Sequence, residues 1–360
     1  MIDKADRFSG VRQLIDDKRY FFLHAPRQTG KTTIMLQLMD ELNSEGDYIA
    51  LYVNVEAGQA WRNNIEQLNR TIVNEFRMNA KIYLPPEYRP SPACFADIGN
   101  EFSMFLINWC LELPKPLVLF MDEVDALIGD GLLSVLRQLR SGYTKRPRAF
   151  PHALCIIGLR DIRDYRIYSD EKMKYVVGGS AFNIKKESTR LEDFTLDHVK
   201  CLYAQHTEDT GQKFSSDAIN SVFYFTNGQP WLVNALGWEL CFGKFAIPFE
   251  TSVQAADVDR SVEILIQRRD VHLDQLSDKL TEPRVARVIE AILVGEKRAT
   301  EDITTEDRQY LIDLGLIRVG RQGLEIANPI YREVVPRELT LYDQDTIGQD
   351  PAWYIKEKGK

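Results

Sequence analysis

The chain has 360 residues, of which 44% are hydrophobic and 27% are charged, so it can bury the cores of two or three globular domains. Its formal net charge of −8 excludes a global attraction to nucleic acid or to an anionic membrane surface. The sequence has no apolar run of about 18 residues and no apolar leader core, so we expect a cytoplasmic protein without a membrane partner. Five scattered cysteines without paired spacing argue against disulfides or a zinc site.

Strand and helix signals alternate over roughly the first 160 residues. In chain order, apolar runs predict strands at 20–23, 47–54, 117–121 and 153–158, and helical spacing predicts helices at 33–39, 59–80, 101–113 and 130–141. The proline-rich stretch 84–92 is expected to form a loop. Continuous apolar strands separated by helices are typical of a doubly wound α/β fold, in which helices cover both faces of a parallel sheet.

The strand signals stop after about residue 190. Helices are then expected at 196–206, 215–226, 231–241 and 255–276. Further on, two helical runs at 284–294 and 305–314 precede two short apolar runs at 315–320 and 323–327. Two helices followed by a short β-hairpin are the pattern of a winged helix. The end of the chain is polar and is expected to be a tail.

The loop between the first strand and the first helix has the pattern of a phosphate-binding loop, Ala-Pro-Arg-Gln-Thr-Gly-Lys-Thr at 25–32. Gly30 allows the backbone to approach a phosphate, whose oxygens would face successive N–H groups and the positive end of the helix. Lys31 would neutralise the terminal phosphates, and the Thr32 hydroxyl would ligate Mg²⁺. Ala25 replaces the usual first glycine and fits there if its φ stays negative.

The residues expected to hold the nucleotide through this loop are Ala25, Pro26, Arg27, Gln28, Thr29, Gly30, Lys31, Thr32 and Thr33.

A second motif, Asp122-Glu123, closes the apolar strand at 117–121. Ligands of open α/β sheets bind at the carboxyl ends of the strands, where these two carboxylates should lie. Asp122 would hold Mg²⁺ together with Thr32, and Glu123 would orient or deprotonate an attacking water. The two strand-end motifs together predict ATP and Mg²⁺ as cofactors, because each motif alone is common.

With these motifs, the chain resembles the AAA+ ATPases of the signal-transducing (STAND) branch over roughly residues 7–340. It is similar in particular to a bacterial set of AAA-like ATPases. The strings that carry this similarity are HAPRQTGKT at 24–32, VNVE at 53–56, LRQLRSGY at 136–143, GLRDIRDYRI at 158–167 and IANPIYREVVPREL at 326–339. Longer members of the set continue into a PD-(D/E)XK nuclease-like domain, so this chain is expected to be a fragment or a gene prediction cut at both ends.

The resemblance implies four parts, which are a P-loop ATPase α/β core at 1–190, an all-α helical lid at 191–281, a winged helix at 282–340 and a polar tail at 341–360.

The resemblance also implies roles for three further residues, each beside a plainer alternative. Asn54 would hydrogen-bond the catalytic Glu123 and gate it, or would only cap the segment that follows. Arg160 would sense the γ-phosphate, or would only pair with Asp161. Pro230, in Gly-Gln-Pro at 228–230, would contact the nucleotide from the lid, or would only begin a helix. Both functions of Pro230 are compatible.

Arg137 and Arg140 lie three residues apart on one face of the helix at 130–141. One of them would serve as an arginine finger that reaches a neighbouring subunit of a homo-oligomer. The alternative is a solvated helix face.

Taken together, the sequence predicts ATP binding and slow Mg²⁺-dependent hydrolysis that drives a conformational switch, felt by an unidentified effector protein or domain. One alternative is a nucleotide-gated binding module that barely hydrolyses ATP. Another is a DNA-dependent ATPase. Nucleic acid is not the expected partner, because the expected winged helix has nine Lys and Arg against ten Asp and Glu between 283 and 339, with Glu306 and Asp307 where a groove-binding helix would begin.

Overall fold

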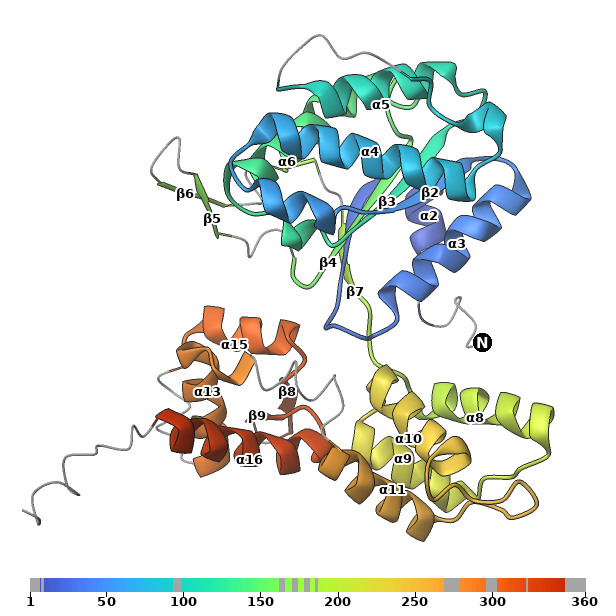
Figure 1. The fold of residues 1–360 in the computed structure, drawn as a ribbon, viewed down its shortest axis with the longest axis vertical. Helices are drawn as coiled ribbons and strands as arrows, with labels where there is room; N and C mark the ends of the chain where they lie inside the picture. The colour runs from blue at the N-terminus through green and yellow to red at the C-terminus, as the bar shows by residue number, and fades with distance from the viewer. Residues whose placement is uncertain are drawn as a thin grey trace, which may run out of the picture. The chain divides into compact units, whose positions relative to one another are not determined.

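The computed structural model describes residue 7 and residues 10–92, 99–161, 166–169, 174–177, 182–184, 187–268, 279–295, 303–321 and 323–346 (Figure 1). The chain divides into two compact units, with the boundary between Glu192 and Asp193. None of the helices in the described ranges combines the length and apolarity needed to cross a bilayer.

A five-stranded parallel sheet forms the centre of the first unit. Its strands are β1 (Tyr20–His24), β2 (Ile49–Asn54), β3 (Leu117–Asp122), β4 (Ala153–Gly158) and β7 (Glu187–Arg190), in the order β2-β3-β4-β1-β7. Four of these strands were predicted as apolar runs. The fifth, β7, was missed because its sequence Glu-Ser-Thr-Arg is polar and lies at the edge of the sheet, where one flank of a strand needs no partner. No strand was predicted between residues 159 and 190, although the strand signals were expected to stop only after about residue 190.

A second, separate sheet in this unit pairs β5 (Arg166–Ser169) with β6 (Lys174–Val177) in antiparallel register. The sequence did not predict it.

Helices cover both faces of the parallel sheet, as the apolar strands predicted. They are α2 (Val11–Asp16), α3 (Lys31–Glu45), α4 (Ile65–Tyr83), α5 (Glu101–Glu112) and α6 (Gly129–Gly142). Figure 1 shows α4, α5 and α6 on one side and α2 and α3 on the other, and the buried side chains form one apolar cluster on each side. Successive strand residues alternate between the clusters. Those facing α3 include Phe21, Leu23, Ala50, Tyr52, Val118 and Phe120.

The helix predicted at 59–80 begins later, at Ile65. Its start is set by Asn64, whose side chain accepts a hydrogen bond from the Gln67 N–H and so satisfies a first-turn donor. The preceding residues Glu56–Trp61 form a 3₁₀ helix instead. The stretch predicted as a loop at 84–92 contains one further short 3₁₀ turn, Pro86–Tyr88.

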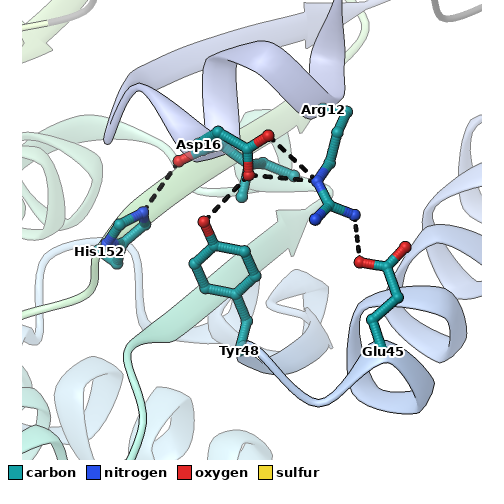
Figure 2. A network of polar contacts seen from close by, with 6 residues as sticks. Arg12, Asp16, Glu45, Tyr48 and His152 are labelled. Atoms are coloured by element: carbon teal, nitrogen blue, oxygen red, sulfur yellow. Dashed lines mark hydrogen bonds and ion pairs between the residues drawn. The ribbon is translucent and has the colours of Figure 1, made fainter.

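A polar network ties α2 to the edge of the sheet that is opposite the strand carboxyl ends (Figure 2). The Arg12 guanidinium donates to Asp16 and to Glu45, and the Tyr48 hydroxyl donates to Asp16 at 3.0 Å. The His152 ring, 5.0 Å from the Tyr48 ring, contacts the Ile15 carbonyl through Nε2 at 3.0 Å. Arg12 lies in the first turn of α2, and the other residues precede β2 and β4 or end α2 and α3. The network therefore lies away from the carboxyl ends of the strands.

The second unit is mainly helical in its described part. Its elements are α8 (Leu196–Thr210), α9 (Ser216–Thr226), α10 (Pro230–Phe242), α11 (Ala255–Arg268), α13 (Pro283–Val294), α15 (Thr305–Asp313), β8 (Ile317–Gly320), β9 (Gly323–Ile326) and α16 (Pro329–Thr346). Strands β8 and β9 form an antiparallel hairpin. The helix expected at 255–276 is described as far as Arg268, and its remainder lies outside the described residues. The helix α16 continues to Thr346, into the stretch predicted as a tail at 341–360, and residues 347–360 lie outside the described part.

Candidate nucleotide-binding site

The loop between β1 and α3 has the backbone geometry that a phosphate-binding loop needs. Gly30 has φ of 87° and Gln28 has φ of 59°, and both lie in the left-handed region. Ala25 is not among the described residues with positive φ, so alanine fits at this position. Its N–H donates to the Gly158 carbonyl at 3.3 Å, which ties the start of the loop to β4.

Gly30 is the N-cap of α3, and no side chain caps this end of the helix. The N–H groups of the first turn therefore lack a side-chain acceptor, and they carry the positive end of the helix dipole. Elsewhere in the described structure, α4, α8 and α9 have such caps from Asn64, Thr195 and Ser215, whereas α2, α5, α6 and α13 have none. The start of α3 is thus suited to accept an external anion.

Lys31 is the first residue of α3, and its side chain is 9% exposed. Its ammonium donates to the carbonyls of Ala25 and Pro26, each at 2.9 Å. These hydrogen bonds hold the side chain against the start of the loop. Burial lowers the pKa of Lys31, and the nearby charges of Asp122 and Glu123 counter this effect. A desolvated cation of this kind interacts strongly with a phosphate.

The rest of the loop supports this arrangement. Thr29 is buried and its hydroxyl donates to the Pro26 carbonyl at 2.9 Å. Arg27 is exposed at the tip of the loop, and its charge offsets a small part of the upward shift that burial gives to the pKa of Glu123. The side chains of Thr32 and Thr33 are exposed at the start of α3.

Asp122 at the end of β3 joins the two sequence motifs. Its Oδ2 accepts hydrogen bonds from the Thr32 hydroxyl at 2.9 Å and from the Tyr52 hydroxyl at 2.6 Å, and its Oδ1 accepts the Glu123 N–H at 2.8 Å. Asp122 is 1% exposed. Burial and the charge of Asp122 raise the pKa of Tyr52, so its phenol remains a donor. Three donors hold the carboxylate toward the first turn of α3.

Glu123 leaves the strand in a left-handed conformation, with φ of 56°. A strand that simply continued would place its side chain on the face opposite Asp122, so this turn re-aims it. Burial, followed by the charges of Asp125 and Asp122, raises the pKa of Glu123. A carboxylate with a raised pKa is a better proton acceptor than an ordinary surface glutamate.

Two predicted residues lie at the same edge of the sheet. Asn54 ends β2 directly opposite Asp122 in the strand register, and its Oδ1 accepts the Glu56 N–H at 2.8 Å. This is the local capping role; gating of Glu123 stays a prediction. Arg160 comes two residues after β4, which lies between β1 and β3 in the sheet. Its role as a sensor also stays a prediction.

Three predicted residues lie away from this edge or in the second unit. Arg137 and Arg140 are both exposed on α6, where either could face a neighbouring subunit. Pro230 is the first residue of α10, and the Gln229 side chain caps that helix by accepting the Leu232 N–H at 2.6 Å. The helix-start function of Pro230 is therefore present, while its contact with a nucleotide stays a prediction.

Sequence reasoning missed three residues that contact this region. Tyr52 was counted only as part of an apolar strand, although a hydroxyl two residues before a strand end can reach the same edge. Asp125 is a third carboxylate close to Glu123, and burial raises its pKa. Arg7 donates to the Thr29 carbonyl at 3.2 Å and to the Glu192 carbonyl at 2.7 Å, a link for which the sequence had no signal.

The model of a family of AAA-like domains matches residues 19–335, which include both strand-end motifs and most of the second unit. The chain belongs to this AAA-like family. Its fold is that of P-loop ATPases of the AAA+ type, as the motifs predicted. The sequence matches none of the curated proteins.

The solved structures to which this AAA-like protein is similar have little sequence identity to it. The Walker-type ATPase PABY2304 of Pyrococcus abyssi is 15% identical with a TM-score of 0.60, covering 93% of this chain and 96% of that one. Cdc6p of Pyrobaculum aerophilum is also 15% identical, with a TM-score of 0.49 over 96% and 95% of the two chains. RuvB of Thermotoga maritima is 13% identical, with a TM-score of 0.45 over 93% and 95%.

The residues of the AAA-like protein fit ATP and Mg²⁺. The uncapped start of α3 and the buried Lys31 would hold phosphates. Thr32 and Asp122 supply the hard oxygen ligands that Mg²⁺ prefers. The Oδ1 atom of Asp125 is buried and has no hydrogen-bond partner in the described structure, so it could accept from a metal-bound water.

Proposed function

We propose that the protein binds ATP with Mg²⁺ at the loop 25–32 and hydrolyses it slowly. The observation that carries this proposal is the hydrogen bond of 2.9 Å between Thr32 and Asp122, which brings the two motifs together at the start of α3. Membership of the AAA-like family supports it, since the family match covers both motifs.

Each residue of the site has a defined task. The Lys31 ammonium and the first N–H groups of α3 would bind the β- and γ-phosphates, and Thr32 and Asp122 would hold Mg²⁺. When bound, the metal would neutralise charge on the transferred phosphoryl group. The Glu123 carboxylate would accept the proton of an attacking water, which its left-handed backbone and raised pKa favour.

Fast hydrolysis would require a sensor, a gate and an arginine finger, and the finger would come from a neighbouring subunit, so we propose slow turnover for the single chain. Arg160 would sense the γ-phosphate from the end of β4, and Asn54 would gate Glu123. Arg137 or Arg140 would act on the site of a neighbouring subunit, so turnover would rise with oligomerisation. A stimulation of this kind would depend on protein concentration.

The output we propose is the conformational switch of a signal-transducing ATPase. The helices at 191–281 would serve as a lid, from which Pro230 contacts the nucleotide, and 282–340 would form a winged helix that passes the change to an effector. In the second unit, Arg287 is paired with Asp307 at 2.8 Å and Arg318 with Glu325 at 2.7 Å. These pairs leave less positive charge for nucleic acid and support a protein effector.

Phosphate release from ATP tests the proposed hydrolysis. The wild-type protein should release phosphate in the presence of Mg²⁺, and Glu123→Gln should lower the rate at least tenfold. If both proteins release phosphate only at the blank rate while binding ATP, the protein is a nucleotide-gated module. Stimulation by duplex DNA at physiological salt would instead support a DNA-dependent ATPase.

A further inference from the structure

Tyr52 connects the edge strand of the sheet to the carboxylate of the metal site. It lies on β2, and its side chain belongs to the buried cluster that faces α3. Asp122 is the last residue of β3 and, since side chains alternate along a strand, lies on the same face as Val118 and Phe120. The β2/β3 register pairs Tyr52 with Phe120, two residues before Asp122. The long phenol spans this step and reaches Asp122 Oδ2 at 2.6 Å.

The three groups that donate hydrogen bonds to Asp122 come from different parts of the fold, so they constrain the orientation of its carboxylate differently. The Glu123 N–H is the next peptide group along the chain, and the Thr32 hydroxyl belongs to the residue that would ligate Mg²⁺. Tyr52 is the donor from a neighbouring strand, and at 7% exposed it is held by packing. An ionised carboxylate has about four lone-pair positions, so three donors leave one for a metal-bound water.

We propose that Tyr52 is a positioning residue for the magnesium site and sets its affinity through Asp122. This inference rests on the proposed function. The Tyr52 hydroxyl holds the carboxylate in the one orientation that also accepts from Thr32, so that the metal meets a preformed pair of oxygens. Magnesium requires near-ideal octahedral geometry, and residues that orient a ligand commonly change metal affinity by about 10–100-fold when replaced.

The chain contains a matched control for the loss of a phenol. Tyr48 lies just before the same strand β2, and its hydroxyl donates to the carboxylate of Asp16 at 3.0 Å (Figure 2). Tyr48→Phe and Tyr52→Phe each remove one phenol–carboxylate hydrogen bond at opposite ends of β2. Only the second of these bonds involves Asp122.

The test follows the release of the fluorescent nucleotide mant-ADP from the full chain at a series of free magnesium concentrations. Wild-type and Tyr48→Phe proteins should reach half-maximal slowing of release at the same concentration. Tyr52→Phe should need about tenfold more magnesium, while its release rate in EDTA stays within about twofold of wild type. In an Asp122→Asn background, Tyr52→Phe should shift the midpoint by less than about twofold, because its effect passes through that carboxylate.

The experiment distinguishes failure of the proposed function from failure of the positioning role of Tyr52. If wild-type protein does not take up mant-ADP at all, the proposed function is wrong. If it does, and Tyr52→Phe has the wild-type magnesium midpoint, the positioning role is wrong. A Tyr52→Phe shift that persists unchanged with Asp122→Asn, or loss of the cooperative melting transition in Tyr52→Phe, would assign Tyr52 to packing and contradict the proposal.

Discussion

Thr32 Oγ1 and Asp122 Oδ2 lie 2.9 Å apart although 90 residues separate them in the chain. The contact arises because β1 and β3 both end at the same edge of a parallel sheet, with β4 between them. The helix that follows β1 begins at that edge, so a hydroxyl in its first turn meets the carboxylate at the end of β3. This relationship is the structural basis of the predictions below.

Replacement of Gly30 by alanine should weaken nucleotide binding as well as lower the free energy of unfolding. Gly30 has φ of 87°, and Gly46 at the other end of the same helix has φ of 80°. A left-handed alanine costs about 1–2 kcal/mol, so Gly30→Ala and Gly46→Ala should lower the free energy of unfolding by similar amounts. Only Gly30→Ala should also reduce ATP affinity, which titration calorimetry measures. Equal ATP affinity in the two variants would contradict the loop assignment.

Replacement of Glu123 by glutamine should raise the thermal stability at pH 7. In the unfolded chain this carboxyl ionises near its ordinary pKa of 4.5, and burial raises its pKa in the folded protein. Ionisation of Glu123 above the raised pKa therefore disfavours the folded state, and glutamine removes that penalty. The melting temperature of Glu123→Gln should exceed that of wild type at pH 7, and the difference should vanish as the pH falls below 4.5.

The same raised pKa predicts the acidic limb of the pH–rate profile for hydrolysis. Glu123 accepts a proton only when it is ionised, so the rate should fall as the pH decreases through its folded pKa. In kcat/KM, which reports the pKa of the free protein, the midpoint of this limb should lie above 4.5. A profile that stays flat down to that pH would remove Glu123 from the role of proton acceptor.

Replacement of Gly228 by alanine should destabilise the second unit. A Cβ at Gly228 would lie 1.9 Å from the Phe194 carbonyl oxygen, whereas one at Gly211 would have no heavy atom within 4 Å. Both residues have positive φ, 77° and 81°, so their backbone penalty is the same. Gly211→Ala should cost about 1 kcal/mol of unfolding free energy, and Gly228→Ala about 3 kcal/mol or more because backbone must move. Similar losses in chemical denaturation would contradict this difference.

The apolar parts of the fold were the most predictable from the sequence. Strands such as β3 and β4 are largely apolar runs, because a parallel sheet covered by helices buries both faces. The polar strand β7 and the late start of α4 escaped prediction, since each depends on a neighbour. The strand β7 pairs with β1, and Asn64 caps α4.

The sequence predicted those residues of the candidate site that belong to a recognisable local motif. Gly30, Lys31 and Thr32 form a contiguous motif, and Asp122 follows an apolar strand. Tyr52 could not be identified from the sequence, because its contact with Asp122 depends on the strand register and on which face of β2 it occupies. A phenol in a buried strand is more often a packing residue.

Calorimetric titration of ATP into the full chain with millimolar Mg²⁺ tests the central claim most directly. Lys31→Ala removes the buried ammonium of the loop, and Lys115→Ala removes a half-buried lysine just before β3, at the opposite edge of the sheet. We predict one binding site with comparable affinity in wild type and Lys115→Ala, and affinity at least about tenfold weaker in Lys31→Ala. Absence of any heat of ATP binding in the wild-type protein, or equal affinity in all three proteins, would contradict the account.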